Sequence, residues 1–210
     1  MSWKKLLTLK QTWAFIAGKF FTDPIWFFFL FWLPSYFSSI FNLDFKEPSL
    51  PLVLIYSGTM VGSLGGGYLS SWLIKKGWPV YKARKTALFV AALCVIPIMV
   101  TRYTDDMWIV VGLLTLSVAA NQAWSANIYS IVPDMFPGKV VATVVGLGGM
   151  AGAIGSVIFP LFIGLILDFY KNTGNILAGY NIIFLVCGSS FLIAWIIIHF
   201  LVPKMDKVQL

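Results

Sequence analysis

Six long apolar segments alternate with short polar stretches along the chain, and this pattern predicts six membrane-spanning helices. Crossing about 30 Å of hydrocarbon takes roughly 20 residues of apolar helix. All the segments but the third reach that length, and we expect the third to extend into its flanks. The predicted helices cover residues 12–40, 50–74, 86–101, 107–132, 140–167 and 179–201.

Composition agrees with a protein whose solvent is a bilayer. Hydrophobic residues make up 59% of the 210 residues and charged residues 11%, whereas about a quarter of the residues in soluble domains are charged. We therefore predict an all-α, multi-pass integral membrane protein. The net charge of +7 does not indicate nucleic-acid binding, because the basic residues flank apolar segments. Cys94 and Cys187 lie inside apolar runs and suggest neither a disulfide nor a metal site.

Basic residues are divided unevenly between the two ends of the predicted bundle, and this division predicts its orientation. Short cytoplasmic loops are enriched in Lys and Arg. Eleven basic residues fall on one side and three on the other, while Lys19 lies inside the first helix, so both termini are expected to be cytoplasmic. The eleven are Lys4, Lys5, Lys10, Lys75, Lys76, Lys82, Arg84, Lys85, Lys139, Lys204 and Lys207, and the three are Lys46, Arg102 and Lys171.

The predicted helices differ in polar and glycine content. The first, second, fourth and fifth carry most of both, so we expect them to line the space that the bundle encloses. The third and the later part of the sixth are almost uniformly apolar and are expected to face lipid. Small residues four positions apart permit close helix packing. These are Gly58, Gly62, Gly65, Gly66 and Gly67 in the second helix and Gly146, Gly148, Gly149, Gly152 and Gly155 in the fifth.

The first helix carries two charged residues deep in the membrane. At about 1.5 Å of rise per residue, Lys19 lies about 10 Å deep and Asp23 about 16 Å, close to the midplane. One interpretation is that the two side chains, four residues apart, only neutralise each other. The other is that they face a wet cavity, where Lys19 attracts an anion and Asp23 holds its charge or exchanges a proton. We expect Pro24 and Pro34 to interrupt the helix nearby, and Trp26 to lie in the same cavity.

The fourth helix carries a second polar cluster at a similar depth. Four of its residues fall on or beside one helix face: Asn121, Gln122, Trp124 and Ser125. An indole among amides and hydroxyls suits a polyhydroxylated ligand, although hydrogen bonds between helices would use the same groups. Tyr129 lies beside this face. Asn127 and Ser130 point elsewhere and are expected to be structural.

Enzymatic chemistry is not predicted. The sequence has no arrangement of nucleophile, histidine and carboxylate, no metal-binding cluster and no acid pair within a predicted span. We therefore expect no catalytic residue, no metal and no cofactor. A channel is disfavoured, because no ring of charges or filter sequence is present.

Three segments resemble the hexuronate-transporter branch of the anion:cation symporters within the major facilitator superfamily. They are GKFFTDPIWFFFLFWLP in the first helix, NQAWSANIYSIVPDMFP in the fourth and the following VVATVVGLGGMAGAIGS. The resemblance covers the chain, but only the second half of a family member, helices seven to twelve of twelve. It implies a linker at 1–11, a six-helix half at 12–203 and a cytoplasmic tail at 204–210.

The resemblance also implies a function. It places Lys19 and the segment around Trp124 at a sugar-acid site, and it implies proton-coupled symport of a carboxylated sugar by alternating access. An N-terminal six-helix half is then the expected partner, and the bacterial cytoplasmic (inner) membrane the expected location. The segment GYLSSWLIKKG departs from the family pattern, because Ser71 stands where an aspartate is expected, while Lys75 and Lys76 keep the positive charge.

Two alternatives remain open at the level of sequence. The chain is a transporter half for another small organic anion, such as an aldonate or aldarate, or it is a membrane remnant or interaction subunit that transports nothing. In the second case Lys19 and Trp124 would serve assembly or stability and bind no ligand.

Overall fold

The computed structural model describes residues 3–43 and 49–208, and within these ranges all regular structure is helical. Lys46, one of the three basic residues on the minor side, lies outside the described residues. Six helical spans in these ranges are long and apolar enough to cross a membrane, which confirms the predicted number. The helices are α1 (Trp3–Leu6), α2 (Lys10–Phe31), α3 (Leu33–Phe41), α4 (Leu50–Lys75), α5 (Val80–Val95), the 3-10 helix η1 (Ile96–Tyr103), α6 (Met107–Met135), α7 (Gly138–Asn172) and α8 (Ile176–Leu201).

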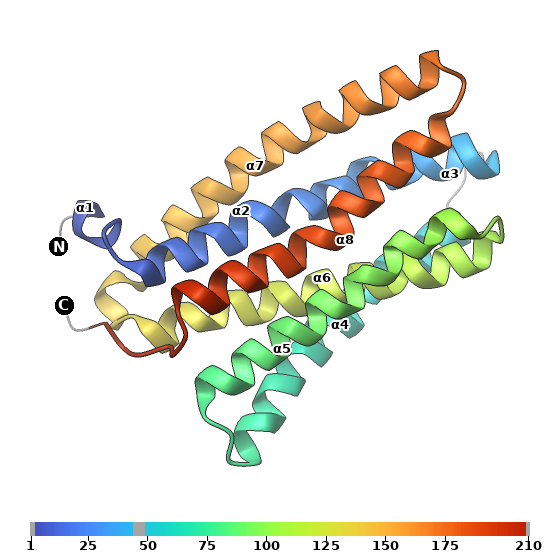
Figure 1. Cartoon of the computed structure of the whole chain (residues 1–210). Coiled ribbons are helices and arrows are strands. Elements are labelled where there is room, and N and C mark those ends of the chain that lie inside the picture. The colour runs from blue at the N-terminus through green and yellow to red at the C-terminus, as the bar shows by residue number, and fades with distance from the viewer. Residues whose placement is uncertain (1–2, 44–48, 209–210) are drawn as a thin grey trace.

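The spans are arranged around α2 and α6. α2 packs most extensively on α7, and α4 on α6, while α2 and α6 also contact each other. In Figure 1, α8 and α5 pass in front of α2 and α6, α7 forms one edge of the bundle, and α4 with α5 forms the other. Both described ends of the chain lie at the same end of the bundle (Figure 1), as six consecutive spans require.

The third and first spans differ from the predicted ranges for local reasons. The third is longer at its start, because α5 begins at Val80, and its last part tightens into η1, which has proline near its first turn. In the first span, α2 ends at Phe31 and α3 follows from Leu33, with Pro34 in the first turn of α3. Pro24 does not end α2, so the expected break lies near Pro34 alone. A single proline removes one hydrogen bond, and the surrounding helical bonds hold the segment together.

The spans differ in how much of their surface this chain itself buries. Only 22% of the residues in the most apolar window are buried in α4 and in α7, compared with 44% in α8 and 39% in the span Val80–Tyr103. The uniformly apolar helices pack on the core because their side chains suit a protein interior as well as lipid. α4 and α7 use a narrow glycine face for packing and leave the large side chains on their other faces exposed.

Candidate functional site

A polar cavity of about 280 Å³ lies between α2 and α6. Both walls come from the middle of their helices, so the two polar clusters of the sequence meet at one depth. Its lining includes all seven residues singled out from the sequence and adds two more, Thr22 and Phe27. The seven are Lys19, Asp23, Trp26, Asn121, Gln122, Trp124 and Ser125.

The Lys19 ammonium is held on two sides. Its Nζ lies 2.8 Å from Asp23 Oδ2, four residues along the same helix. It also donates a hydrogen bond of 2.7 Å to the hydroxyl of Tyr129 on α6 and lies 4.2 Å from the centre of that ring. The Lys19 side chain is only 4% exposed, whereas that of Asp23 is 28% exposed. The two side chains are therefore paired with each other and also line the cavity.

The α6 side of the cavity offers neutral polar groups around an indole. Trp124 is buried and packs edge-on against Phe191 of α8, with ring centres 5.4 Å apart. Its indole N–H is buried and finds no hydrogen-bond acceptor among the described residues. An unsatisfied buried donor is costly and needs a water or ligand oxygen. Asn121 is buried and Gln122 and Ser125 are half-buried beside it.

Sequence reasoning missed Tyr129 as a member of the site. Its position beside the polar face of α6 was visible in the sequence, but its contact with Lys19 depends on how α2 and α6 pack. Thr22 follows Lys19 by three residues, so helical spacing was the available signal for it. Its hydroxyl donates to the carbonyl oxygen of Gly18 at 2.8 Å.

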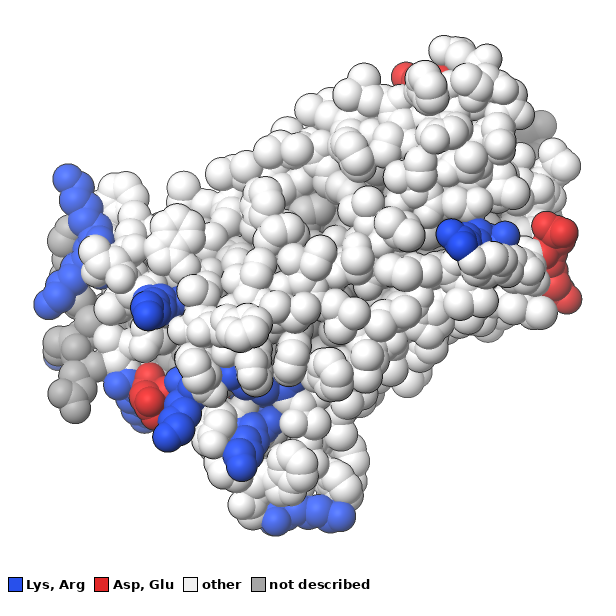
Figure 2. Space-filling model, in the orientation of Figure 1, with Lys and Arg blue, Asp and Glu red and all other residues white. Residues whose placement is uncertain are grey.

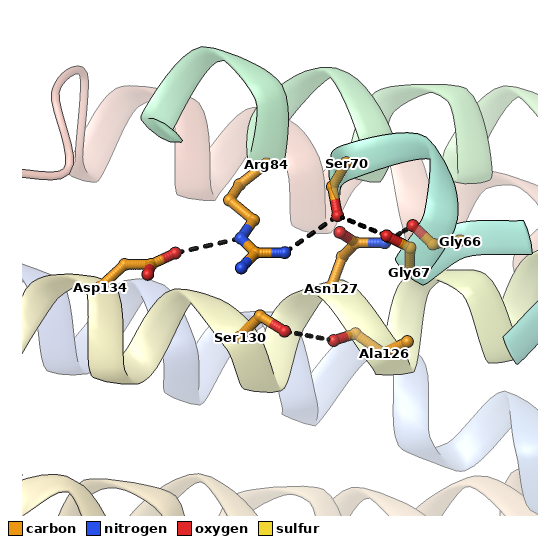
Figure 3. Close-up of polar contacts among 8 residues, drawn as sticks. All are labelled: Gly66, Gly67, Ser70, Arg84, Ala126, Asn127, Ser130 and Asp134. Atoms are coloured by element: carbon orange, nitrogen blue, oxygen red, sulfur yellow. Dashed lines mark hydrogen bonds and ion pairs between the residues drawn. The ribbon is translucent and has the colours of Figure 1, made fainter. Parts of the chain in front are cut away.

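Two other polar residues of α6 are structural, as predicted. The Asn127 amide donates to the carbonyl oxygen of Gly66 on α4 at 2.8 Å and to that of Ala123 at 2.9 Å. Ser130 donates to the carbonyl oxygen of Ala126, one turn earlier, at 2.8 Å. Figure 3 shows both residues turned to backbone partners.

A polar cluster joins α4, α5 and α6 (Figure 3), near the end of α4 and the start of α5. Arg84 of α5 donates to the Ser70 hydroxyl of α4 at 2.9 Å and to Asp134 Oδ2 of α6 at 3.1 Å. Ser71, which stands where the family pattern has an aspartate, is exposed. The carboxylate in this cluster therefore comes from Asp134 of α6. Of the two serines in the segment GYLSSWLIKKG, Ser70 and not Ser71 contacts Arg84.

Comparison with known proteins identifies the family. The model of the Major Facilitator Superfamily matches residues 1–160. The "Probable galactarate/D-glucarate transporter GarP" of Escherichia coli (strain K12) is 25% identical over 207 residues, which cover 99% of this chain and 45% of that protein. The "Hexuronate transporter" of the same strain is 27% identical over 173 residues, 80% of this chain and 39% of the relative.

A third relative is the "Probable galactarate/D-glucarate transporter GudP" of Bacillus subtilis (strain 168). It is 28% identical over 169 residues, which are 79% of this chain and 36% of that protein. The chain thus spans less than half the length of these relatives. Their names describe transport proteins and not enzymes. The length of the family match establishes that this chain belongs to the Major Facilitator Superfamily.

Proposed function

We propose that the chain is the C-terminal six-helix half of a secondary active transporter that carries sugar acids by alternating access. The observation that carries this proposal is the Lys19–Asp23 pair, which lines a polar cavity in the middle of the spans. Charged groups at such depth cost at least a few kcal/mol and are typical of substrate or ion pathways. The names of the relatives, which include hexuronate, galactarate/D-glucarate and D-galactonate transporters, support a sugar acid as the substrate.

The cavity walls divide into a charged side and a neutral side. Among the described residues, Lys19 is the one cation in the lining, and it binds the ligand carboxylate. The indole of Trp124 offers an apolar face to the sugar ring and an N–H to one of its oxygens. Trp26 closes the α2 side, and three polar residues of α6 hold the hydroxyl groups: Asn121, Gln122 and Ser125.

Proton coupling is proposed for Asp23. Because Asp23 is more exposed than Lys19, an anion that enters the cavity meets a carboxylate before it reaches the ammonium. One proton on Asp23 removes this repulsion and releases Lys19 for the ligand. A carboxylate and a proton that enter together leave the net charge of the cavity unchanged, which avoids an unpaired charge in a low-dielectric site.

A second half is proposed as the partner. Within the part of the chain that the structure describes, the cavity lining comes from α2 and α6 alone, and no other helix supplies an opposite wall. Large apolar side chains are exposed on the adjoining edge helices α4 and α7, among them Met60, Leu64, Met150 and Leu161. An N-terminal six-helix half would cover these faces. In this proposal residues 1–11 are the linker, 12–203 the transporter half and 204–210 a cytoplasmic tail, in the inner membrane of a bacterium.

Binding by the purified chain in lipid nanodiscs tests the site. We expect labelled glucuronate to bind more tightly at mildly acidic than at alkaline pH, and glucose not to compete. Lys19→Ala and Trp124→Ala should each weaken binding about tenfold or more, since each removes a buried polar contact to the ligand. Lys171→Ala, an exposed residue outside the cavity, is the matched control. Unchanged binding in Lys19→Ala would contradict the proposed site.

Uptake into vesicles tests the half-transporter proposal. Glucuronate uptake driven by a pH gradient is expected when the chain is combined with a matching N-terminal half, and not with the chain alone. Full uptake by the chain alone, as a monomer, would overturn the proposal. A membrane remnant predicts that no variant of the cavity changes ligand binding.

Aldarates and aldonates form a second candidate substrate class, favoured by the names of two relatives, the galactarate/D-glucarate and D-galactonate transporters. Competition of galactarate and galactonate against labelled glucuronate separates these classes. Stronger competition by galactarate would assign the site to a dicarboxylate.

A further inference from the structure

The carboxylate of Asp23 lies in a space that Gly152 of α7 leaves open. A Cβ added at Gly152 would overlap Asp23 Oδ2 and would lie 3.0 Å from Asp23 Cγ and 3.2 Å from its Cβ. Both contacts are shorter than ordinary van der Waals distance. With α2 and α7 at their present separation, any side chain at position 152 therefore displaces the Asp23 carboxylate.

The neighbouring glycines of α7 have different surroundings. A Cβ at Gly148 would meet the ring of Phe15, and one at Gly155 would meet the carbonyl oxygen of Phe20 at 2.8 Å. Gly149 has nothing within 4 Å of its added Cβ. Among the glycines of the described residues, Gly152 alone has a charged side chain in that space.

The opposite side of the pair is fixed by α6. The Tyr129 hydroxyl accepts a hydrogen bond from Lys19 Nζ at 2.7 Å, so the ammonium is held between that hydroxyl and the Asp23 carboxylate. The cavity leaves only 4% of the Lys19 side chain exposed. Because both partners occupy the ammonium, we expect a ligand carboxylate to bind Lys19 only after Asp23 moves or loses its charge.

We propose that Gly152 is a positioning residue of the site: the room it leaves keeps the Asp23 carboxylate on Lys19 and so makes anion binding depend on neutralising Asp23. The link to anion binding rests on the proposed function, whereas the positioning of Asp23 stands on its own.

Among the described residues, the titratable groups on the helices around Asp23 include the following. Lys19 lies on the same helix and Tyr129 on α6, and both belong to the pair just described. On α8, the Tyr180 hydroxyl donates to Ser35 and the His199 ring stacks on Trp195. The charged residues of α7 stand near its two ends: Lys139, Asp168 and Lys171.

Carbodiimide labelling of Asp23, measured by mass spectrometry on the full chain in nanodiscs, tests the positioning without a ligand. A carbodiimide reacts with a protonated carboxyl group in the membrane, and a nearby ammonium keeps the carboxyl ionised. We expect Gly152→Ala to raise Asp23 labelling at neutral pH about tenfold, since an opposite charge at this distance typically changes the protonated fraction by that factor or more. Lys19→Met should raise it to a similar level.

Two α7 variants are matched controls. Gly149→Ala adds a methyl group in open space, and Gly148→Ala disturbs the α2–α7 contact at Phe15 without touching Asp23. Both should label as the unchanged chain does. The proposal is overturned if Gly152→Ala labels as the unchanged chain does, if Gly148→Ala rises equally, or if Lys19→Met has no effect.

A folding defect in Gly152→Ala is itself informative. If the conflict lies with Asp23, adding Asp23→Ala to Gly152→Ala removes the overlapping carboxylate and restores the yield of folded protein. Failure of this second change to rescue folding would overturn the assignment, because the conflict would then lie elsewhere between α2 and α7.

Ligand binding then separates the inference from the proposed function. In Gly152→Ala, glucuronate binding should lose most of its pH dependence, and in the Asp23→Asn background Gly152→Ala should change affinity less than twofold. If the unchanged chain binds no sugar acid, the proposed function fails while the labelling result still decides the role of Gly152. If binding occurs and Gly152→Ala keeps its full pH dependence, the inference fails alone.

Discussion

Buried basic side chains in this chain each find a specific polar partner. Lys19 is paired with Asp23 and Tyr129, and Arg84 with Asp134. Lys85 of α5 is buried and uses backbone acceptors: its Nζ donates to the carbonyl oxygen of Pro203 at 2.9 Å and of His199 at 3.5 Å. These carbonyls follow or end α8, where a helix leaves acceptors unpaired and favours positive charge.

Lys85→Met tests this cap at the end of α8. Methionine keeps most of the apolar stem but leaves the carbonyls without a donor, so we expect the free energy of unfolding to fall by about 1 to 3 kcal/mol. Unfolding in a titration with sodium dodecyl sulfate measures the change. Lys82→Met, exposed on the same helix, is the control and should change it little. Equal effects of the two substitutions would contradict the capping role.

At the scale of elements, glycine positions decide how closely α4 approaches α6. A Cβ at Gly62 would overlap the backbone of Ala119, and one at Gly66 would lie 2.6 Å from Ala123 Cβ. Gly65 and Gly67, which the sequence does not distinguish from them, have open space instead. The close contact is therefore carried by a stripe with a spacing of four residues.

Gly62→Ala should destabilise the α4–α6 contact, whereas Gly65→Ala should not. The added methyl group at position 62 has only backbone to displace, so the helices must separate, at a cost of about 1 to 3 kcal/mol. Thermal unfolding of the two variants in the same detergent provides the measurement. A lower melting temperature for Gly65→Ala than for Gly62→Ala would refute this packing.

The contact between Arg84 and Asp134 couples α5 to α6, and Ser70 extends it to α4. Both charged side chains are mostly buried, at 18% and 26% exposure, so solvent screens them only in part. A double-mutant cycle of Arg84→Gln and Asp134→Asn should give a coupling of about 1 kcal/mol in the free energy of unfolding. The same cycle with Asp168→Asn, near the far end of α7, should give none.

At the scale of the whole molecule, charge on the visible surface is concentrated at the ends, whereas Lys19 and Asp23 lie inside the bundle. Lys and Arg gather at the end that holds the termini and over the α4–α5 turn, while the long middle of the visible face is nearly free of charge (Figure 2). This distribution suits a body that lies in hydrocarbon between two aqueous layers. It also supports the proposal that the basic end is cytoplasmic.

Single-cysteine labelling tests the orientation. In a background without Cys94 and Cys187, a membrane-impermeant maleimide added to intact cells should label Lys171→Cys, because its end of α7 is proposed to face outward. Lys76→Cys, at the basic end, should react only after the cells are opened. The reverse pattern would show that the positive-inside rule fails for this chain.

The sequence by itself determined the number of spans, their approximate ranges and the depth of the polar residues. These follow from local properties, because the length of an apolar run and the rise of a helix need no partner. The residues that line the cavity were also recognisable, since Lys19, Asp23 and the Asn121–Ser125 cluster are costly at mid-membrane unless something uses them.

Tertiary packing decided everything that depends on two helices at once. Packing places Tyr129 against Lys19 and Gly152 against the Asp23 carboxylate. It also buries only a minority of the residues of α4 and α7. In a membrane, apolar side chains suit lipid and protein equally, so hydropathy carries little information about which helix face packs inward. Close contact between helices depends on the register between backbones, which only the folded chain defines.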